Sequence, residues 1–466
     1  MLLLRPKQIV PAVLFVGLVI GSFTYDIAHS FRKPPEDPTG ETIHLSLYHW
    51  DNGGNTETDL VKEVCKEFEK DNPNITVDVE IISSYETQFQ NFMASKNVPD
   101  VFLVPDGNFG SWVKTGVMLD LQEYWDNTTN IDKEHLAPSA LKRYRWNGST
   151  MGSGDLYCVP KDITPYVMYY NKELFDEYGV PYPSPTEIMD PYEAMELWKM
   201  FGYNRNTVRF KTNGEMRLMD DHIYGVAKLY PEGLIWSNGA DYLNEARNEA
   251  LIDSDEFIEA YEYIVEATME YAVAPTSKVI TSTPEKSLFL NGKAACYIEG
   301  RSVTTDLRNK ASFDWDIAPI PAFPALQQVN GWSGSVGYAV YKDCEHKDEA
   351  YHLAEYFTSK RGQIIMAEAG FTAPLYNDEQ TMQEFYAIEE GKLPANTGEF
   401  IRAAQYQRPG LWQYLPSTRW KTTFDMDTGA MFTEDPSARL TPRQFLTDEK
   451  ERIEAIIKQD FPELFT

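Results

Sequence analysis

The stretch VPKDITPYVMYYNKELFDEYGVPYPSP occupies residues 159–185 and decides how the rest of the chain is interpreted. Its apolar and aromatic run Val167–Tyr170 is typical of a buried strand. Asn171 then suits the N-cap of a helix, and Gly179 suits the position at which that helix ends. The stretch therefore predicts a strand followed by a helix. A Lys-Asp pair at 161–162 precedes the tyrosine-rich strand, which raises the question of what these side chains face.

The chain before this stretch alternates between strand and helix patterns. In chain order, the predicted strand, helix, strand, helix and strand are residues 41–51, 58–73, 75–82, 85–96 and 99–106. This order is typical of a parallel sheet with right-handed crossovers. Ligands of such sheets bind beyond the carboxyl ends of the strands, where this chain places His49, Trp50, Asp51 and Asp106.

A second series of α/β elements begins with the quoted stretch. The segments that continue it are residues 221–230, 257–272, 287–300, 313–324, 337–342 and 348–370. From about Thr381 the chain is predicted to be mainly helical. Together the two series predict an α/β fold with more than one domain, as the length of 466 residues also suggests.

The composition excludes some classes of partner. A formal net charge of -29 and a pI near 4.6 argue against binding to nucleic acid or to an anionic membrane surface. Aromatic residues make up 13% of the chain, with 10 tryptophans and 28 tyrosines. Most of these rings should be core, but the surplus leaves room for an aromatic-lined site.

The N-terminus predicts export from the cytoplasm. Arg5 and Lys7 precede an apolar run from Ile9 to Phe23, the pattern of a signal peptide or a short membrane anchor over residues 1–30. Residues 31–41 are predicted to be a flexible spacer. No cysteine lies in the first forty residues, which excludes a lipid-modified N-terminal cysteine. The expected location is therefore the periplasm, or the outer face of the membrane if the segment is retained.

The motifs of catalysis and of metal binding are missing. The chain has 7 histidines but no HExxH, no P-loop and no GxGxxG, and GWSGSVG has the wrong glycine spacing for a nucleophile elbow. The 4 cysteines include no CxxC pair. We therefore expect no metal and no cofactor. Whether Cys158 and Cys296 form a disulfide is left open, with two free buried thiols as the expected state.

Four blocks in this order resemble the extracellular solute-binding proteins of family 1, which are the sugar-binding components of bacterial ABC importers and relatives of maltodextrin-binding proteins. The blocks are PDVFLVPDGNFGSWVKTGVMLDL, YCVPKDITPYVMYYNKELFDEYGVPYP, SLFLNGKAACYIEG with FDWDIAPIP, and the segment from SGSVGYAVYK to AGFTAPL. The resemblance covers roughly residues 43–460. It implies a carbohydrate ligand, an ABC permease as partner, and a monomer.

The resemblance also implies the type II periplasmic-binding-protein fold, which has two α/β lobes and a ligand cleft between them that closes on binding. Strands near residues 158–168 and 296–302 would cross between the lobes. The implied boundaries are lobe 1 at 42–160, lobe 2 at 161–275, a return to lobe 1 at 276–325, and the second part of lobe 2 with a helical tail at 326–466.

The residues that the resemblance assigns to the ligand share side chains suited to a neutral sugar. Carboxylates bind hydroxyls, and tryptophan faces cover the apolar faces of pyranose rings. They are Trp50, Asp51, Asp106, Asp162, Tyr166, Trp236, Glu299, Arg301, Trp332, Ser333 and Ser335, and Lys161 is expected to hang over the cleft beside them. Ser302 stands where many relatives carry a tryptophan.

Other interpretations of the same residues remain. Each tryptophan alone could be core. An exported carbohydrate-active enzyme could use an acidic pair such as Asp106 and Glu299. A receptor domain that feeds a membrane sensor is a third alternative, although no signalling module follows in the sequence.

Overall fold

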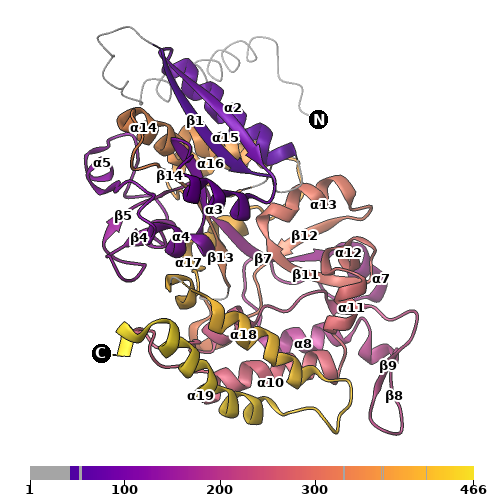
Figure 1. Cartoon of the computed structure of the whole chain (residues 1–466). Coiled ribbons are helices and arrows are strands. Elements are labelled where there is room, and N and C mark those ends of the chain that lie inside the picture. Colours follow the sequence, from indigo (N-terminus) through magenta and orange to yellow (C-terminus); the bar gives the residue numbers. More distant parts are fainter. Residues whose placement is uncertain are drawn as a thin grey trace, which may run out of the picture.

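The structure is a computed structural model that describes residues 42–51, 55–328, 331–368, 370, 372–415 and 417–465. These residues form two α/β lobes, with lobe 1 at the upper left of Figure 1 and lobe 2 below it and to its right. The predicted signal or anchor segment and the spacer lie outside the described residues. Within the described part of the chain, no helix is both long and apolar enough to cross a membrane.

Lobe 1 is built on a five-stranded sheet with the order β2-β1-β3-β14-β6. Its strands are β1 (Ile43–Trp50), β2 (Ile75–Ile82), β3 (Val101–Pro105), β14 (Val336–Val340) and β6 (Val159–Pro160). β1 is parallel to β2 and β3, and the helices α2 (Asn55–Asp71) and α3 (Tyr85–Ser95) connect these strands. The predicted strand and helix order of this region is confirmed.

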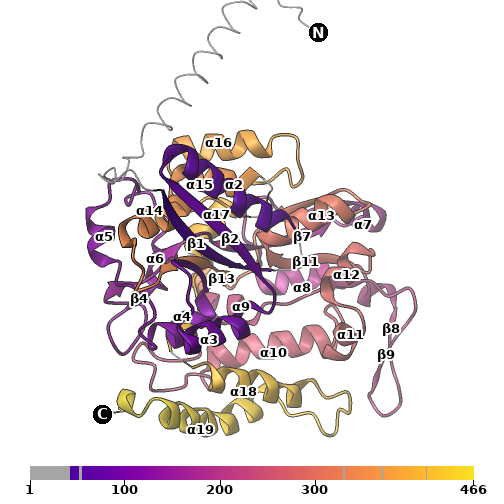
Figure 2. The same ribbon diagram turned by 45° about the horizontal axis from the view of Figure 1, so that its top comes forward.

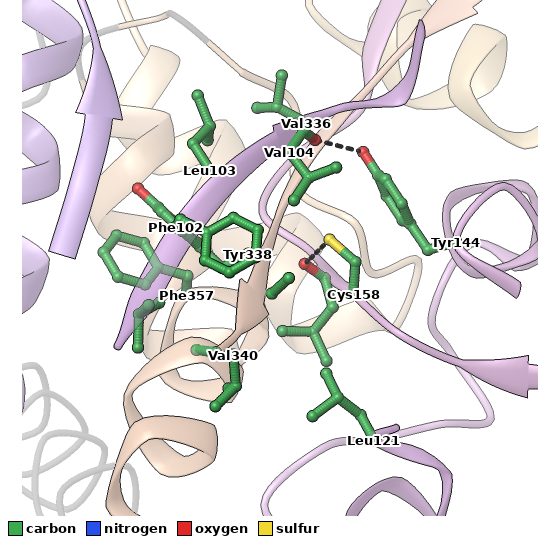
Figure 3. Packing of buried hydrophobic residues seen from close by; sticks show 14 of the residues in the cluster. Phe102, Leu103, Val104, Leu121, Tyr144, Cys158, Val336, Tyr338, Val340 and Phe357 are labelled. Atoms are coloured by element: carbon green, nitrogen blue, oxygen red, sulfur yellow. Dashed lines mark hydrogen bonds between the residues drawn. The ribbon is translucent and has the colours of Figure 1, made fainter. Parts of the chain in front are cut away.

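The core of lobe 1 lies under the centre of this sheet. Figure 3 shows Phe102 and Val104 of β3 packed with Tyr338 of β14 and Phe357 of α14 (Lys347–Thr358). β14 runs antiparallel to both β3 and β6. A Cβ at Gly337 would lie 2.4 Å from the carbonyl oxygen of Val159, so this close pairing of β14 with β6 requires glycine.

Lobe 2 is built around the strand of the quoted stretch. That strand, β7 (Thr164–Asn171), is central in the order β10-β11-β7-β12, and β13 also pairs with it. Its partners are β10 (Tyr224–Val226), β11 (Ala294–Gly300), β12 (Trp315–Ala318) and β13 (Ser333–Gly334). The helix α7 (Lys172–Tyr178) follows it. As predicted, Asn171 Oδ1 accepts the Leu174 N–H at 3.1 Å, and Gly179 ends the helix at a φ of 66°.

The C-terminal part of the chain covers lobe 2. Figure 2 shows α18 (Arg419–Asp427) and α19 (Pro442–Asp460) beside α10 (Asp255–Met269), and α19 packs against α10. The buried side chains Trp198, Trp236 and Trp420 belong to the core beneath them. The predicted helical tail is therefore part of lobe 2.

The remaining elements connect these parts. In lobe 1 and its edges they are α4 (Asp106–Val113), α5 (Gln122–Asn127), α6 (Pro138–Lys142), β4 (Arg145–Trp146), β5 (Asp155–Leu156) and α15 (Lys360–Glu368). In lobe 2 they are α8 (Pro191–Lys199), β8 (Val208–Phe210), β9 (Met216–Leu218), α9 (Pro231–Ser237), α11 (Ser277–Ser282), α12 (Glu285–Leu290), η2 (Arg301–Val303), α13 (Thr304–Lys310) and α17 (Gly398–Tyr406). α16 (Glu379–Glu389) packs against α15.

Two of the chain's crossings between the lobes frame the cleft, and one of these two differs from expectation. The chain first crosses at residues 161–163, between β6 and β7, inside the predicted range. The predicted return at 296–302 is corrected, because Cys296–Gly300 pairs along β7 within the lobe 2 sheet. The return is instead at 333–336, where β13 pairs with β7 and β14 pairs with β3.

This correction moves two of the expected boundaries. Residues 276–325 belong with lobe 2, since β11 and β12 pair with β7 there. The start of the 326–466 segment enters lobe 1 through β14 and α14 before the chain returns to lobe 2. The sequence does not show which lobe these strands belong to, because an apolar strand has the same residue pattern in either sheet. Cys158 and Cys296 are free, and each is buried in the core of a different lobe.

Candidate ligand-binding cleft

A cleft of about 620 Å³ lies between the lobes, where both crossings pass. Its lobe 1 wall consists of the carboxyl ends of β1 and β3 and the first turn of α2, as expected for a parallel sheet. The crossings form its floor, and η2, α12 and α13 form its lobe 2 wall. The lining residues are Trp50, Thr56, Glu57, Pro105, Asp106, Gly107, Asn108, Asp162, Thr164, Lys286, Ser302, Val303, Thr305, Asp306, Trp332, Gly334, Ser335 and Val336.

Hydrogen bonds from Arg143 and Ser335 hold the Asp106 side chain in place. Its Oδ2 accepts a hydrogen bond from Arg143 Nη1 at 2.6 Å and one from the Ser335 N–H at 3.2 Å. Arg143 is itself buried and donates to the carbonyl and the hydroxyl of Ser333 on the return crossing. Burial raises the pKa of Asp106, and the Arg143 guanidinium opposes that shift. The carboxyl group is therefore fixed at the end of β3, on the wall of the cleft.

A buried charge network lies beside Trp50. Glu57 Oε1 is 2.6 Å from Lys161 Nζ, and Lys161 Nζ is 2.8 Å from Asp162 Oδ2. Burial favours the protonated form of Glu57, but Lys161 and His49 outweigh it and hold the pKa of Glu57 well below its usual value. Burial likewise opposes the charge of Lys161, but Asp162 and Glu57 raise its pKa to about 12. Both partners therefore stay charged at neutral pH.

Two tryptophans provide apolar surface in the cleft. Trp50 comes from the end of β1, and its indole N–H donates to Glu57 Oε2 at 3.0 Å. Trp332 lies directly before the return crossing, and its ring meets Tyr166 edge to face with centroids 5.4 Å apart. A Cβ at Gly334 would lie 2.9 Å from Cη2 of Trp332, so the small residue there makes room for the ring. Both rings are half-buried, which suits them to stacking against a ligand.

The charges that line the cleft are paired within the protein. On the lobe 2 wall, Asp306 binds both Lys286 and Lys310. On the lobe 1 side, Asp106 binds Arg143, while Glu57 and Asp162 share Lys161. The uncharged lining groups include the hydroxyls of Ser302, Thr305 and Thr164 and the amide of Asn108. This combination suits a neutral ligand with many hydroxyl groups.

Seven of the eleven residues predicted for the ligand lie at the cleft or directly behind it. Trp50, Asp106, Asp162, Trp332 and Ser335 line it. Tyr166 supports the Trp332 ring, and Ser333 binds Arg143, so both lie behind the lining. Lys161, which was expected to hang over the cleft, is instead fully buried beneath it.

The other four predicted residues lie elsewhere. Asp51 is exposed and accepts a hydrogen bond from Ser83 Oγ at 3.3 Å. Trp236 is 1% exposed in the core of lobe 2, where it stacks on Trp412 and under the guanidinium of Arg408. An aromatic ring among small residues suits a core position as well as a cleft. The sequence pattern therefore led to the wrong prediction that Trp236 lines the cleft.

Glu299 lies in β11 and Arg301 comes directly after this strand. The prediction that β11 is the return crossing explains why both residues were assigned to the cleft. Arg301 is fully buried between the rings of Phe385 and Phe400, and its Nη2 lies 3.4 Å from Glu389 Oε1. Glu299 instead binds Lys228 Nζ at 2.8 Å and the Tyr297 hydroxyl at 3.1 Å. The structure therefore does not bring Asp106 and Glu299 together in the cleft lining.

Sequence reasoning missed Glu57, Arg143, Lys286 and Asp306. In a chain with 71 acidic residues, nothing distinguishes Glu57 or Asp306 from surface carboxylates. The available signal for Glu57 was its place in the first turn of the helix that follows β1. Within the described residues, no group of three or more His, Cys, Asp or Glu side chains is arranged to hold a metal ion.

Comparison with known proteins gives consistent matches. A family model described as bacterial extracellular solute-binding protein matches residues 63–395. An uncharacterised ABC transporter extracellular-binding protein of Pyrococcus horikoshii is 23% identical over 68% of this chain and 70% of its own length. The diacetylchitobiose-binding protein of Streptomyces coelicolor is 20% identical over 77% of this chain and 79% of its own length.

A solved structure shares the fold. It is an ABC substrate-binding protein of Listeria monocytogenes in complex with cycloalternan, and it matches with a TM-score of 0.70 at 21% identity. The match covers 90% of this chain and 99% of that one. The two-lobed architecture is therefore shared along nearly the whole chain.

Proposed function

Because the chain belongs to the bacterial extracellular solute-binding proteins, it is a ligand-capturing protein, and we propose that its ligand is a neutral carbohydrate bound in the cleft between Trp50 and Trp332. The observation that carries this proposal is the combination of two half-buried tryptophans with lining charges that are all paired internally. Pyranose rings offer apolar faces to the indoles and hydroxyls to the polar groups.

The pairing of charges argues for neutrality of the ligand. A phosphate or a carboxylate on the ligand would need a cation, and the cations of the cleft are already bound to Asp106, Glu57, Asp162 and Asp306. For Arg143 and Lys161, whose pairs are buried, the loss of either cation to a ligand would leave an uncompensated carboxylate, which is strongly unfavourable. The partly exposed pair of Lys286 and Asp306 carries no such penalty. Of the similar proteins, one is named for the binding of diacetylchitobiose, and another has a solved structure in complex with cycloalternan.

We propose that the protein acts outside the cytoplasm as part of a transport system. The captured sugar would be delivered to the transmembrane subunits of an ABC transporter, and the protein would act as a monomer in the periplasm or at the outer face of the membrane. The family match and the transporter-related names of its relatives support this placement.

The protein is proposed to release its sugar intact. The alternative of a carbohydrate-active enzyme needs two carboxyl groups flanking one bond, and its candidate Glu299 is bound to Lys228 instead of lining the cleft. Incubation with a bound oligosaccharide, followed by chromatography, tests this. Shorter sugars that disappear with an Asp106→Asn variant would establish the enzyme alternative.

A thermal-shift screen tests the ligand class. The panel contains maltotriose, diacetylchitobiose and galactotriose, each beside a phosphorylated or uronic acid counterpart. A ligand at about 100 times its Kd stabilises the folded state by about 2.7 kcal/mol through mass action. We expect a rise in melting temperature with at least one neutral sugar and none with its charged counterpart. A rise with charged compounds alone would contradict the proposal.

A further inference from the structure

Glu57 occupies an unusual place for a carboxylate in the first turn of a helix. It lines the edge of the cleft, yet its side chain is only 1% exposed. Its Oε2 accepts the indole N–H of Trp50 at 3.0 Å, and its Oε1 accepts Lys161 Nζ at 2.6 Å. His49 Nε2 lies 3.5 Å from Oε1. The carboxylate is thus held by side chains from β1 on one side and from the first crossing on the other.

Lys161 connects Glu57 to both crossings through hydrogen bonds. Lys161 Nζ also binds Asp162 Oδ2, and Asp162 Oδ1 accepts the Val336 N–H at 3.1 Å. The backbone N–H of Lys161 donates to the Val336 carbonyl at 2.8 Å. Residues 161–163 form the first crossing, and Val336 begins β14 directly after the return crossing. A continuous set of contacts therefore joins the ring of Trp50 to the two crossings that frame the cleft.

We propose that Glu57 is a positioning residue that orients the Trp50 ring for the ligand and couples that ring to the two crossings through Lys161. The inference rests on the proposed function for its ligand, a neutral sugar stacked on Trp50. Glu57 acts through Trp50 because its oxygens are occupied by the indole and the ammonium group. The coupling is reciprocal, so a ligand that favours one orientation of Trp50 also favours one arrangement of the crossings.

Substitution by glutamine breaks this arrangement with little change in shape. Trp50 Nε1 and Lys161 Nζ are both donors, and a glutamine side chain has one acceptor oxygen and one NH₂ donor. At position 57 one of the two donors would then face another donor. Asp59 lies on the same helix but is exposed, so Asp59→Asn is a matched control for the loss of a charge there.

The first experiment needs no ligand. The full chain is labelled with ¹⁵N in its tryptophan indoles, and Trp50→Phe identifies the Trp50 resonance by its loss. We expect Glu57→Gln to shift this resonance, and Lys161→Arg, which keeps the charge but does not touch Trp50, to shift it as well. Asp59→Asn should leave it in place. A Trp50 resonance unmoved by Glu57→Gln or by Lys161→Arg would overturn the positioning role or the coupling, respectively.

The second experiment measures affinity by calorimetry with whichever of maltotriose, diacetylchitobiose or galactotriose gives the largest thermal shift. Glu57→Gln should weaken binding about tenfold or more, the range for a hydrogen bond to a charged group. In a Trp50→Phe background the same change should cost less than about twofold, since coupled residues are not additive. Equal losses in both backgrounds would overturn the inference. If no sugar binds, the proposed function fails while the indole experiment still decides the role of Glu57.

Discussion

The buried guanidinium of Arg143 lies 2.6 Å from Asp106 Oδ2 and also donates to the Ser333 carbonyl at 2.9 Å. One side chain therefore joins the end of β3, on the wall of the cleft, to the return crossing. Because Asp106 is almost fully buried, its charge depends on this partner.

Replacement of Arg143 by methionine should destabilise the fold. The change leaves Asp106 as a buried carboxylate without its cation, which costs about 3–5 kcal/mol in comparable cases. Denaturant melts measure the free energy of unfolding. Lys142→Met removes an exposed positive charge next to it, together with its contact 5.8 Å from the centre of the Tyr414 ring, and should cost no more than about 1 kcal/mol. Similar losses for both variants would contradict the assigned role of Arg143.

Trp332 and Trp236 were both predicted from the sequence to contact the ligand, but their substitution should have different effects. Trp332→Ala should weaken sugar binding by about 1–3 kcal/mol, or roughly 5- to 150-fold, with stability nearly unchanged. Trp236→Ala should instead cost about 3–5 kcal/mol of stability, because it removes a fully buried ring from the core of lobe 2. Calorimetry and denaturant melts on both variants separate the effects. Unchanged affinity of Trp332→Ala for the sugar would show that Trp332 does not contribute to the binding site.

The contribution of Glu57 to stability should depend on pH. Its pKa in the folded protein is lowered from 4.5, so the unfolded state takes up a proton first as the pH falls. The stabilising effect is therefore complete above about pH 5 and is lost at more acid pH. The difference in unfolding free energy between the wild type and Glu57→Gln should narrow between pH 6 and pH 3. A difference that stays constant over this range would show that Glu57 is not held ionised.

Gly337 should not tolerate a side chain. A Cβ there would lie 2.4 Å from the Val159 carbonyl oxygen and 2.6 Å from Cys158 Sγ, between the two strands that flank the crossings. Gly337→Ala should therefore cost about 1–3 kcal/mol, the usual range for overpacking. At Gly429 a Cβ would meet no atom within 4 Å, so Gly429→Ala serves as the control. Equal stabilities in urea melts would show that β14 and β6 can separate without cost.

The parts of the fold that local sequence controls were predictable. Caps and apolar periodicity located β7, α7 and the first three strands of lobe 1, and the carboxyl ends of β1 and β3 located Trp50 and Asp106. The return crossing was not predictable in this way, because sheet membership of β11 depends on pairing with β7 and not on its own residues. The same limit explains the misplacement of Arg301, which follows that strand.

The role of Glu57 could not be predicted from the sequence for a related reason. Its role depends on contacts with Trp50 and Lys161, which lie 7 and 104 positions away in the chain. A single sequence does not show which of many acidic residues meets a buried lysine. The tryptophans of the cleft were easier to propose, since few side chains suit the face of a sugar ring.

The most direct test of the central claim is a crystal structure of the protein with the neutral oligosaccharide that stabilises it most. We predict a sugar ring within about 4 Å of the Trp332 or Trp50 ring, the usual limit of apolar contact, and a sugar hydroxyl that donates to Asp106. A sugar bound outside this cleft, or bound without contact to either tryptophan, would contradict the account.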